Sequence, residues 1–231
     1  MTVWLRSTTS TMLDATVLAE KGEPHGTVVV AESQTGGIGR HGHEWHSADT
    51  GGLYVSIILR LERPPDELPI VTMALGLAVQ AAVNGATGLA SDIRWPNDLM
   101  LNGRKAAGVI AQLTSPGVMI AGIGLNVNQT EFPDELGSLA TSLRIETDRE
   151  FDKPAILDSL VAECLYWAVQ PKAKIIAEFE KNSTWAKGKC VEVDGRWHGV
   201  TAGLDPNGFL LVATPAGTET VLSGGVREVT M

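Results

Sequence analysis

The sequence predicts an α+β fold, in which a mixed, mainly antiparallel sheet is flanked by helices and followed by a small all-β domain. Up to about residue 184, short apolar runs with sharp turns alternate with segments of helical spacing. After Trp185 only short strand-like runs with close turns remain, which is typical of a small barrel. We therefore divide the chain into domains 1–184 and 185–231.

Composition limits the function classes before any motif is considered. The chain has 231 residues, 44% of them hydrophobic, so it is expected to bury a globular core. Its net charge of −9 disfavours a DNA partner, because phosphate contacts require a local surplus of Lys and Arg. The N-terminus lacks an apolar leader, and the most apolar stretch, residues 70–83, is shorter than the roughly 20 residues of a membrane span.

Cysteine usage agrees with a protein of the reducing cytoplasm. Cys164 and Cys190 are the two cysteines, and they form no C-x-x-C pair. We interpret both as structural thiols and expect a cytoplasmic chain without a membrane partner.

The first half of the chain predicts elements in a clear order. Ser10 is a helix N-cap, and Gly22 stops the helix that it begins. The segments that follow are a buried strand at 27–32, a Gly-rich loop at 36–52, a strand at 53–59, and a helix at 67–84 ended by Asn84-Gly85.

The second half begins with hairpins. Asn102-Gly103 between apolar runs is a strong hairpin signal, and Ser115-Pro116-Gly117 marks another turn. Strands are expected at 92–95, 99–101, 105–113 and 117–127, a polar loop at 128–150, and helices around 156–165 and 175–179. The tail predicts strands at 190–195, 197–204, 209–213 and 218–222.

The segment Gly37–Gly42, GIGRHG, has the G-x-G-x-x-G spacing of a dinucleotide-binding turn. That motif requires a helix after the third glycine, but residues 43–52 have no apolar face and the next strand follows at once. We instead predict a long loop that covers a ligand, with Arg40 and Trp45 as its functional side chains.

Histidines in the same loop raise the alternative of a metal site. His41, His43 and His46 lie close to Glu44, but the sequence supplies no second cluster of ligands to complete such a site. We therefore interpret them as solvated loop residues.

Several blocks together identify the chain as similar to the biotin protein ligases. They are Ser10-Thr11, Gly37-Ile38-Gly39-Arg40 with Trp45, Trp95-Pro96-Asn97-Asp98, Arg104-Lys105 with Gly108, and Gly122-Ile123-Gly124-Leu125-Asn126. The resemblance implies the class II synthetase-like catalytic fold of that family and an SH3-like C-terminal barrel. It also implies ATP-dependent activation of biotin as biotinyl-5′-AMP, followed by transfer to a lysine of a biotin carboxyl carrier protein.

The resemblance also assigns roles to residues at matching positions. Arg40 and Lys105 are the expected catalytic residues, since fixed cations stabilise charge that develops at a phosphate. The biotin site is expected to contain Ser10, Thr11, Met12, Gln34, Gly37, Ile38, Gly39, Arg40, Lys105 and Gly108. ATP is expected to contact Arg40, Trp45, Asn97, Asp98, Lys105 and Asn126, with Asp98 as a Mg²⁺ ligand. Relatives are often homodimers, and the sequence leaves a monomer and a homodimer as alternatives.

Departures from the family pattern leave alternatives open. Ile38, His41 and His43 stand where the common bacterial loop has arginines, and Met12 replaces the usual Asn. Only nine residues precede Ser10, so we expect the monofunctional type without a DNA-binding domain. The two rival hypotheses are a lipoate ligase or lipoyl transferase of the same fold, and a biotin-binding module without catalysis.

Overall fold

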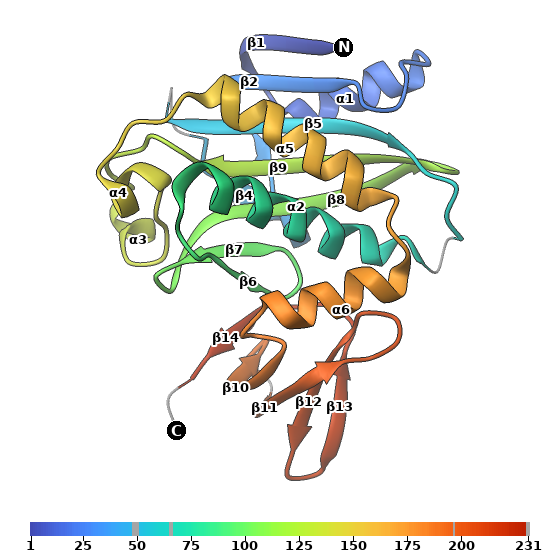
Figure 1. The fold of residues 1–231 in the computed structure, drawn as a ribbon, viewed down its shortest axis with the longest axis vertical. Coiled ribbons are helices and arrows are strands. Elements are labelled where there is room, and N and C mark those ends of the chain that lie inside the picture. The colour runs from blue at the N-terminus through green and yellow to red at the C-terminus, as the bar shows by residue number, and fades with distance from the viewer. Residues whose placement is uncertain (48–50, 65–66, 196, 230–231) are drawn as a thin grey trace.

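The computed structural model describes residues 1–47, 51–64, 67–195 and 197–229. Its elements build a larger α+β part and, below it, a smaller β part that carries the C-terminus (Figure 1). The larger part contains β1 (Thr2–Thr8), β2 (Val28–Gln34), β3 (Gly37–Ile38), β4 (Glu44–Trp45), β5 (Gly52–Arg60), β6 (Asp92–Arg94), β7 (Asp98–Leu101), β8 (Arg104–Ser115) and β9 (Val118–Asn126). Its helices are α1 (Thr11–Glu20), α2 (Pro69–Thr87), α3 (Asp134–Gly137), α4 (Leu143–Thr147), α5 (Lys153–Ala168) and α6 (Lys172–Asn182).

The main sheet has seven strands in the order β1-β2-β5-β9-β8-β7-β6. Only β1 and β2 pair in parallel, and the other neighbours are antiparallel. The predicted mixed, mainly antiparallel sheet is therefore confirmed. The antiparallel pairing of β2 with β5 also agrees with the rejection of a dinucleotide-binding βαβ unit, which requires parallel strands.

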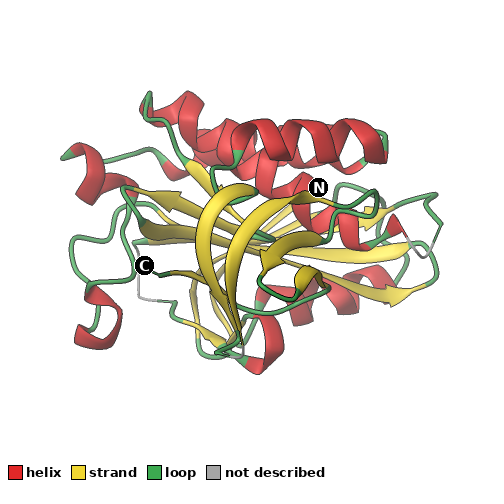
Figure 2. Ribbon diagram, turned by 90° about the horizontal axis from the view of Figure 1, so that it is seen from below, coloured by secondary structure: helices red, strands yellow, loops and turns green. Residues whose placement is uncertain are grey.

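Helices cover both faces of this sheet (Figure 2). Helices α2 and α5 pack against each other and against strands on one face, whereas α1 packs on β2, β5 and β9 from the other. Helix α2 is long and apolar enough to cross a membrane, but 72% of that stretch is buried inside the protein. It is the buried core helix that the sequence predicts.

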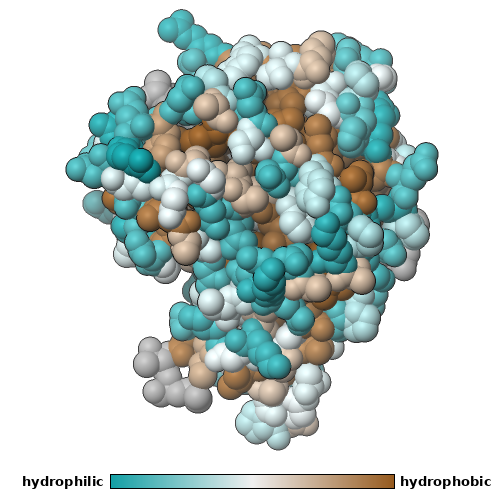
Figure 3. Space-filling view, in the orientation of Figure 1, coloured by the Kyte–Doolittle hydropathy of each residue, from teal (hydrophilic) through white to brown (hydrophobic). Residues whose placement is uncertain are grey.

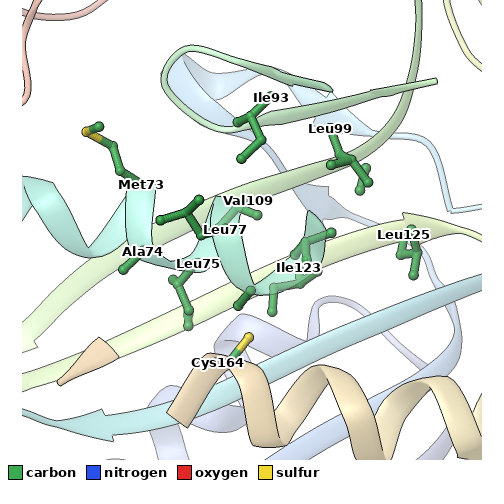
Figure 4. Packing of buried hydrophobic residues seen from close by; sticks show 14 of the residues in the cluster. Met73, Ala74, Leu75, Leu77, Ile93, Leu99, Val109, Ile123, Leu125 and Cys164 are labelled. Atoms are coloured by element: carbon green, nitrogen blue, oxygen red, sulfur yellow. The ribbon is translucent and has the colours of Figure 1, made fainter. Parts of the chain in front are cut away.

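The core lies between α2, α5 and the sheet (Figure 4). Leu75 and Leu77 of α2, Val109 and Ile123 of the central strands and Cys164 of α5 all belong to this cluster. Burial raises the pKa of the Cys164 thiol, so this cysteine is a neutral packing group, as predicted. Outside the core, apolar side chains on the α2 and α5 face are interspersed with polar ones (Figure 3).

The C-terminal strands form a second sheet in the order β13-β12-β11-β10-β14. They are β10 (Lys187–Val193), β11 (Trp197–Leu204), β12 (Leu210–Thr214), β13 (Gly217–Val221) and β14 (Val226–Glu228). All neighbours are antiparallel, and the sheet is open, so the closed barrel expected from the sequence is not confirmed. The indole of Trp95 donates to the carbonyl of Gly208 at 3.0 Å and ties this sheet to the larger part. The boundary at 184 stays a prediction.

Some elements differ from the sequence prediction. Strand β1 was not expected, although Val3 and Leu5 alternate with exposed neighbours. Helix α2 continues past Asn84-Gly85 and ends at Gly88, which has the left-handed φ of 75° that stops a helix. The segment 128–150 contains α3 and α4, which are too short to give a periodic apolar pattern.

Candidate active site

One cavity of about 860 Å³ lies between the main sheet and the C-terminal sheet. Its wall brings together the start of α1, the end of β2, the 38–45 loop, the β6–β7 turn, and β8 and β9. Residues of the C-terminal sheet complete the wall: Glu192, Asp194, Gly195 and 223–227. Segments far apart in the chain therefore share one site.

One end of the cavity consists of neutral hydroxyl and amide groups. The Thr11 backbone N–H and hydroxyl both donate to Oε1 of Gln34, at 2.9 and 3.2 Å. The Thr11 hydroxyl also lies 2.8 Å from Oγ of Ser56, and Nε2 of Gln34 donates to Ser47 at 3.0 Å. Ser10, predicted as the N-cap of α1, accepts from the backbone of Met12 at 3.3 Å. These groups can both donate to and accept from a polar, uncharged ligand.

A patch of glycines forms the floor on β8 and β9. Gly108 and Gly124 are register partners across the two strands. The Trp45 ring lies against both, since a Cβ on Gly124 would approach this ring to 2.3 Å and one on Gly108 to 2.8 Å. Gly122 leaves room for Met12 in the same way, with 2.6 Å from its hypothetical Cβ to the sulfur. Side chains at these three positions would fill the space that Trp45 and Met12 occupy above the two strands.

The other end of the cavity is charged. Oδ1 of Asp98 lies 2.6 Å from Nζ of Lys105, and Oδ2 lies 2.6 Å from Nη2 of Arg94. Burial alone would raise the pKa of this carboxyl, but Lys105 and Arg94 outweigh it and hold the pKa below its usual value. Asp98 is therefore an anion held between two cations.

Arg40, from the 38–45 loop, adds a third cation to this charged end. Its Nη1 donates to Oδ1 of Asn97 at 3.0 Å, and Asn97 is fixed by its own donation to the Val109 carbonyl at 2.7 Å. Burial lowers the pKa of the Arg40 guanidinium, while Asp98 and Asp194 oppose that shift. An arginine stays charged under these conditions. Arg40 and Lys105 are thus bound to the neighbouring residues Asn97 and Asp98.

A tight turn delivers Lys105 to this point. Asn102 and Gly103 have φ angles of 47° and 77°, the left-handed pair of a two-residue hairpin turn. Lys105 is then fixed by backbone bonds to Leu139 and Thr141, at 2.8 and 2.9 Å. The hairpin predicted from Asn-Gly is confirmed, and it places the lysine at the cavity.

The structure brings most of the predicted site residues to this cavity. Lining positions are Ser10, Thr11, Met12, Gln34, Ile38, Gly39, Arg40, Trp45, Asn97, Asp98, Lys105 and Gly108. Gly37 and Asn126 are not among them: Gly37 packs beside Ser47, and Asn126 donates to the Thr141 carbonyl at 2.9 Å. His43 also lines the cavity, whereas the side chain of His41 and residues 48–50 of the loop lie outside the described residues.

Sequence reasoning missed several cavity residues. Ser56 does not line the cavity itself but lies fully buried beside Thr11, and a serine within the apolar run of β5 is a signal that the sequence offers. Arg94 directly precedes the Trp95-Pro96-Asn97-Asp98 block, but a lone arginine beside a strand carries no specific signal. The C-terminal residues, such as Asp194, reach the cavity only through the packing of the second sheet.

The expected Mg²⁺ ligand does not fit direct coordination here. Both oxygens of Asp98 are already held by cations, so a metal ion would have to displace Arg94 or Lys105. Within the described ranges, no cluster of three or more His, Cys, Asp or Glu side chains is arranged to hold a metal. We therefore derive no step through a protein-bound ion.

Comparison with known proteins identifies the family of this chain. The profile of the Biotin/lipoate A/B protein ligase family matches residues 4–129. The chain belongs to this family. The family resemblance expected from the motif blocks is thereby confirmed.

Named relatives of this ligase family extend the match over nearly the whole chain. The Bifunctional ligase/repressor BirA of Bacillus subtilis is 31% identical, over 94% of this chain and 71% of its own length. The Biotin--[acetyl-CoA-carboxylase] ligase of Paracoccus denitrificans is 29% identical, over 94% and 96%. The biotin protein ligase from Aquifex aeolicus, solved in complex with biotin and ATP, superposes with a TM-score of 0.85, at 30% identity over 99% of both chains.

Proposed function

We propose that this chain is an ATP-dependent biotin protein ligase. One observation carries the proposal: Arg40 and Lys105 line the same cavity and are bound to the adjacent residues Asn97 and Asp98, with a neutral hydrogen-bonding end beside them. The two ends match the two parts of the reaction, an uncharged ring and a reacting phosphate. The named ligase relatives and the Aquifex complex with biotin and ATP support the same activity.

The first step joins biotin to the nucleotide. A carboxylate oxygen of biotin attacks the α-phosphorus of ATP, the bond to the bridging β-phosphate oxygen breaks, and pyrophosphate leaves. Negative charge increases on the phosphate oxygens as this occurs, so the Lys105 ammonium and the Arg40 guanidinium are placed to stabilise it. The planar fork of Arg40 suits contact with carboxyl and phosphate oxygens together.

The second step transfers the acyl group to a protein. The neutral amine of an acceptor lysine attacks the biotinyl carbonyl carbon and an amide bond forms. The bond to the anhydride oxygen breaks, AMP leaves with that oxygen, and the proton of the amine passes to water. We propose a biotin carboxyl carrier protein as the acceptor. The Lys105 ammonium and the Arg40 guanidinium, which Asn97 holds in place, would keep the departing phosphate group in the pocket during attack.

The neutral end favours biotin over lipoate. Ser10, Thr11 and Gln34 line this end and carry both donors and acceptors, which a ureido ring can use. A dithiolane ring offers no comparable partners, so it would cover these polar groups without gaining hydrogen bonds from them.

We extend the proposal to the setting of the enzyme. The two cysteines are free, which supports a reducing cytoplasm. The C-terminal sheet is proposed as the counterpart of the SH3-like domain of the family, and a homodimer stays a prediction. Any Mg²⁺ that accompanies ATP would be carried chiefly by triphosphate oxygens and water, since Asp98 is already paired.

Exchange of labelled pyrophosphate into ATP tests the proposal directly. We expect exchange that depends on biotin, and mass spectrometry of a carrier domain incubated with biotin, ATP and Mg²⁺ should record one added biotinyl group. Exchange that depends on lipoate would identify the lipoate alternative. Binding of biotin without pyrophosphate release at saturating ATP would identify a non-catalytic module instead.

A further inference from the structure

Arg94 is a cavity residue to which the motif blocks assign no role. It ends β6 and is the register partner of Asp98 at the start of β7. Its guanidinium binds Oδ2 of Asp98 at 2.6 Å, while Lys105 binds the other oxygen at the same distance. The side chains of Arg94, Asp98 and Lys105 are 24%, 13% and 31% exposed, so this contact is sheltered from solvent competition.

A second contact fixes Arg94 from behind. Its guanidinium carbon lies 5.6 Å from the ring centroid of Trp185, a residue that is only 6% exposed between α6 and β10. A cation over an indole face is attracted by the ring, and the contact strengthens when water is excluded. Arg94 is therefore held by a ring on one side and a carboxylate on the other.

This arrangement determines how Asp98 meets Lys105. A carboxylate with both oxygens free can rotate and grip one ammonium with both of them. Because Arg94 occupies Oδ2, only Oδ1 is left for Lys105, and Nζ stays beside Gly108 at the cavity floor. Asp98 then orients the ammonium without enclosing it.

We propose that Arg94 is a positioning residue for Lys105, acting through Asp98, an inference that rests on the proposed adenylation activity. Arg94 directs one carboxylate oxygen toward Lys105 and keeps the second occupied, so that the ammonium remains available to the phosphate. The paired carboxylate of Asp98 is thereby assigned to the lysine rather than to a metal ion.

Lys189 offers a matched control for the test. Its Nζ lies 5.3 Å from the centroid of the same Trp185 ring and 2.9 Å from a carboxylate oxygen of Glu228. Its side chain is 28% exposed, close to the 24% of Arg94. Lys189→Met therefore removes a cation from the same ring and an ion pair from the same region, with no contact to Asp98.

The kinetic test measures biotin-dependent pyrophosphate release. Arg94→Met should lower kcat about 10- to 100-fold, the usual scale for a misplaced reacting group, with KM for ATP within about threefold. Arg94→Lys should recover most of kcat, and Lys189→Met should match the wild type. In a Lys105→Ala background, Arg94→Met should cause no further loss, because both changes act through one ammonium. A change confined to KM for ATP, or fully additive losses, would overturn the positioning role.

A second readout works without turnover. Acylation of Lys105 by an amine-directed reagent, followed by peptide mass mapping, reports how accessible the ammonium is. Arg94→Met should slow this acylation severalfold because Asp98 then grips the ammonium with both oxygens, and Arg94→Lys should restore it. An unchanged acylation rate in Arg94→Met would contradict the inference, whether or not the protein is a ligase. Absence of turnover in the wild-type protein would contradict the proposed function but not the positioning of Lys105. Thermal melting confirms that each variant is folded.

Discussion

The two ends of the cavity are built on different interactions. At one end the neutral side chains of Ser10, Thr11 and Gln34 line the cavity, and Thr11 contacts both Gln34 and the buried Ser56. At the other end Arg94 and Lys105 hold the carboxylate of Asp98 between them, and Arg40 donates to the adjacent Asn97. The glycine floor of β8 and β9 joins the two.

The difference shows how one site handles two chemical tasks. Neutral hydrogen-bonding groups exchange partners at a net free-energy gain of only about 1 kcal/mol each, which suits recognition of an uncharged ring. Fixed cations in a sheltered site interact strongly with charge that develops during reaction. We therefore expect substitutions at the charged end to alter kcat, and those at the neutral end to alter KM for biotin.

The largest effect is expected for Lys105→Ala. Loss of the ammonium should lower kcat for adenylate formation about 100- to 1,000-fold, the range for removing one preorganised stabilising group. The dissociation constant for ATP should change much less, which isothermal titration can establish. Lys181→Ala, at an exposed surface pair with Glu178, is the control and should leave kcat unaltered. Equal losses in ATP affinity and in kcat would contradict the view that the charged end acts on the reaction rather than on binding.

A smaller effect is expected for Arg40→Ala. The guanidinium is expected to hold the bound intermediate, and charge-assisted hydrogen bonds contribute about 1.5–3 kcal/mol, so biotinyl-AMP should dissociate about 10- to 100-fold faster. Release after rapid dilution measures this rate. Arg40→Lys keeps the charge but loses the planar fork, and it should restore retention only in part. Retention equal to the wild type in Arg40→Ala would contradict this role.

At the neutral end, Thr11→Val removes the hydroxyl that meets Gln34 and Ser56. With about 1 kcal/mol per lost hydrogen bond, KM for biotin should rise about 5- to 30-fold while kcat stays within about threefold. Added salt should leave this increase unchanged, because no charge is involved. Thr8→Val, which removes a hydroxyl of β1 that donates to Asp14 of α1, is the matched control. A fall in kcat with an unchanged KM for biotin would contradict the recognition role of the neutral end.

The smallest effect concerns an acid outside the cavity. Glu146 accepts from Thr141, Asn102 and Arg104, which together outweigh burial and hold its pKa below the ordinary 4.5. A carboxyl with a lowered pKa in the folded state adds stability above its unfolded pKa and loses it as the pH falls through the folded value. Glu146→Gln should lower Tm by about 2–4 °C at neutral pH. The difference in Tm between the wild type and the variant should decrease as the pH drops from about 5 toward 3. A difference that does not depend on pH would show that the charge of Glu146 is not involved.

Prediction from the sequence succeeded where local patterns carry the information. The Ser10 cap, the Asn102-Gly103 turn and the buried helix around 70–83 are local features, and the structure confirms each of them. Short elements without a periodic pattern, such as α3 and β14, were not predicted. Asn126 illustrates a different limit: its motif predicts a nucleotide contact, which stays a prediction, and its amide donates to the Thr141 carbonyl away from the cavity lining.

The sequence by itself determined the family, the order of the main elements and the two cations Arg40 and Lys105, because these depend on residue types at fixed spacing. Only the tertiary structure decided that Asp98 lies between Arg94 and Lys105, and that Asp194 from the second sheet closes the same cavity. Strand register and the packing of the two sheets set those contacts. Such long-range geometry is not encoded in any short stretch of residues.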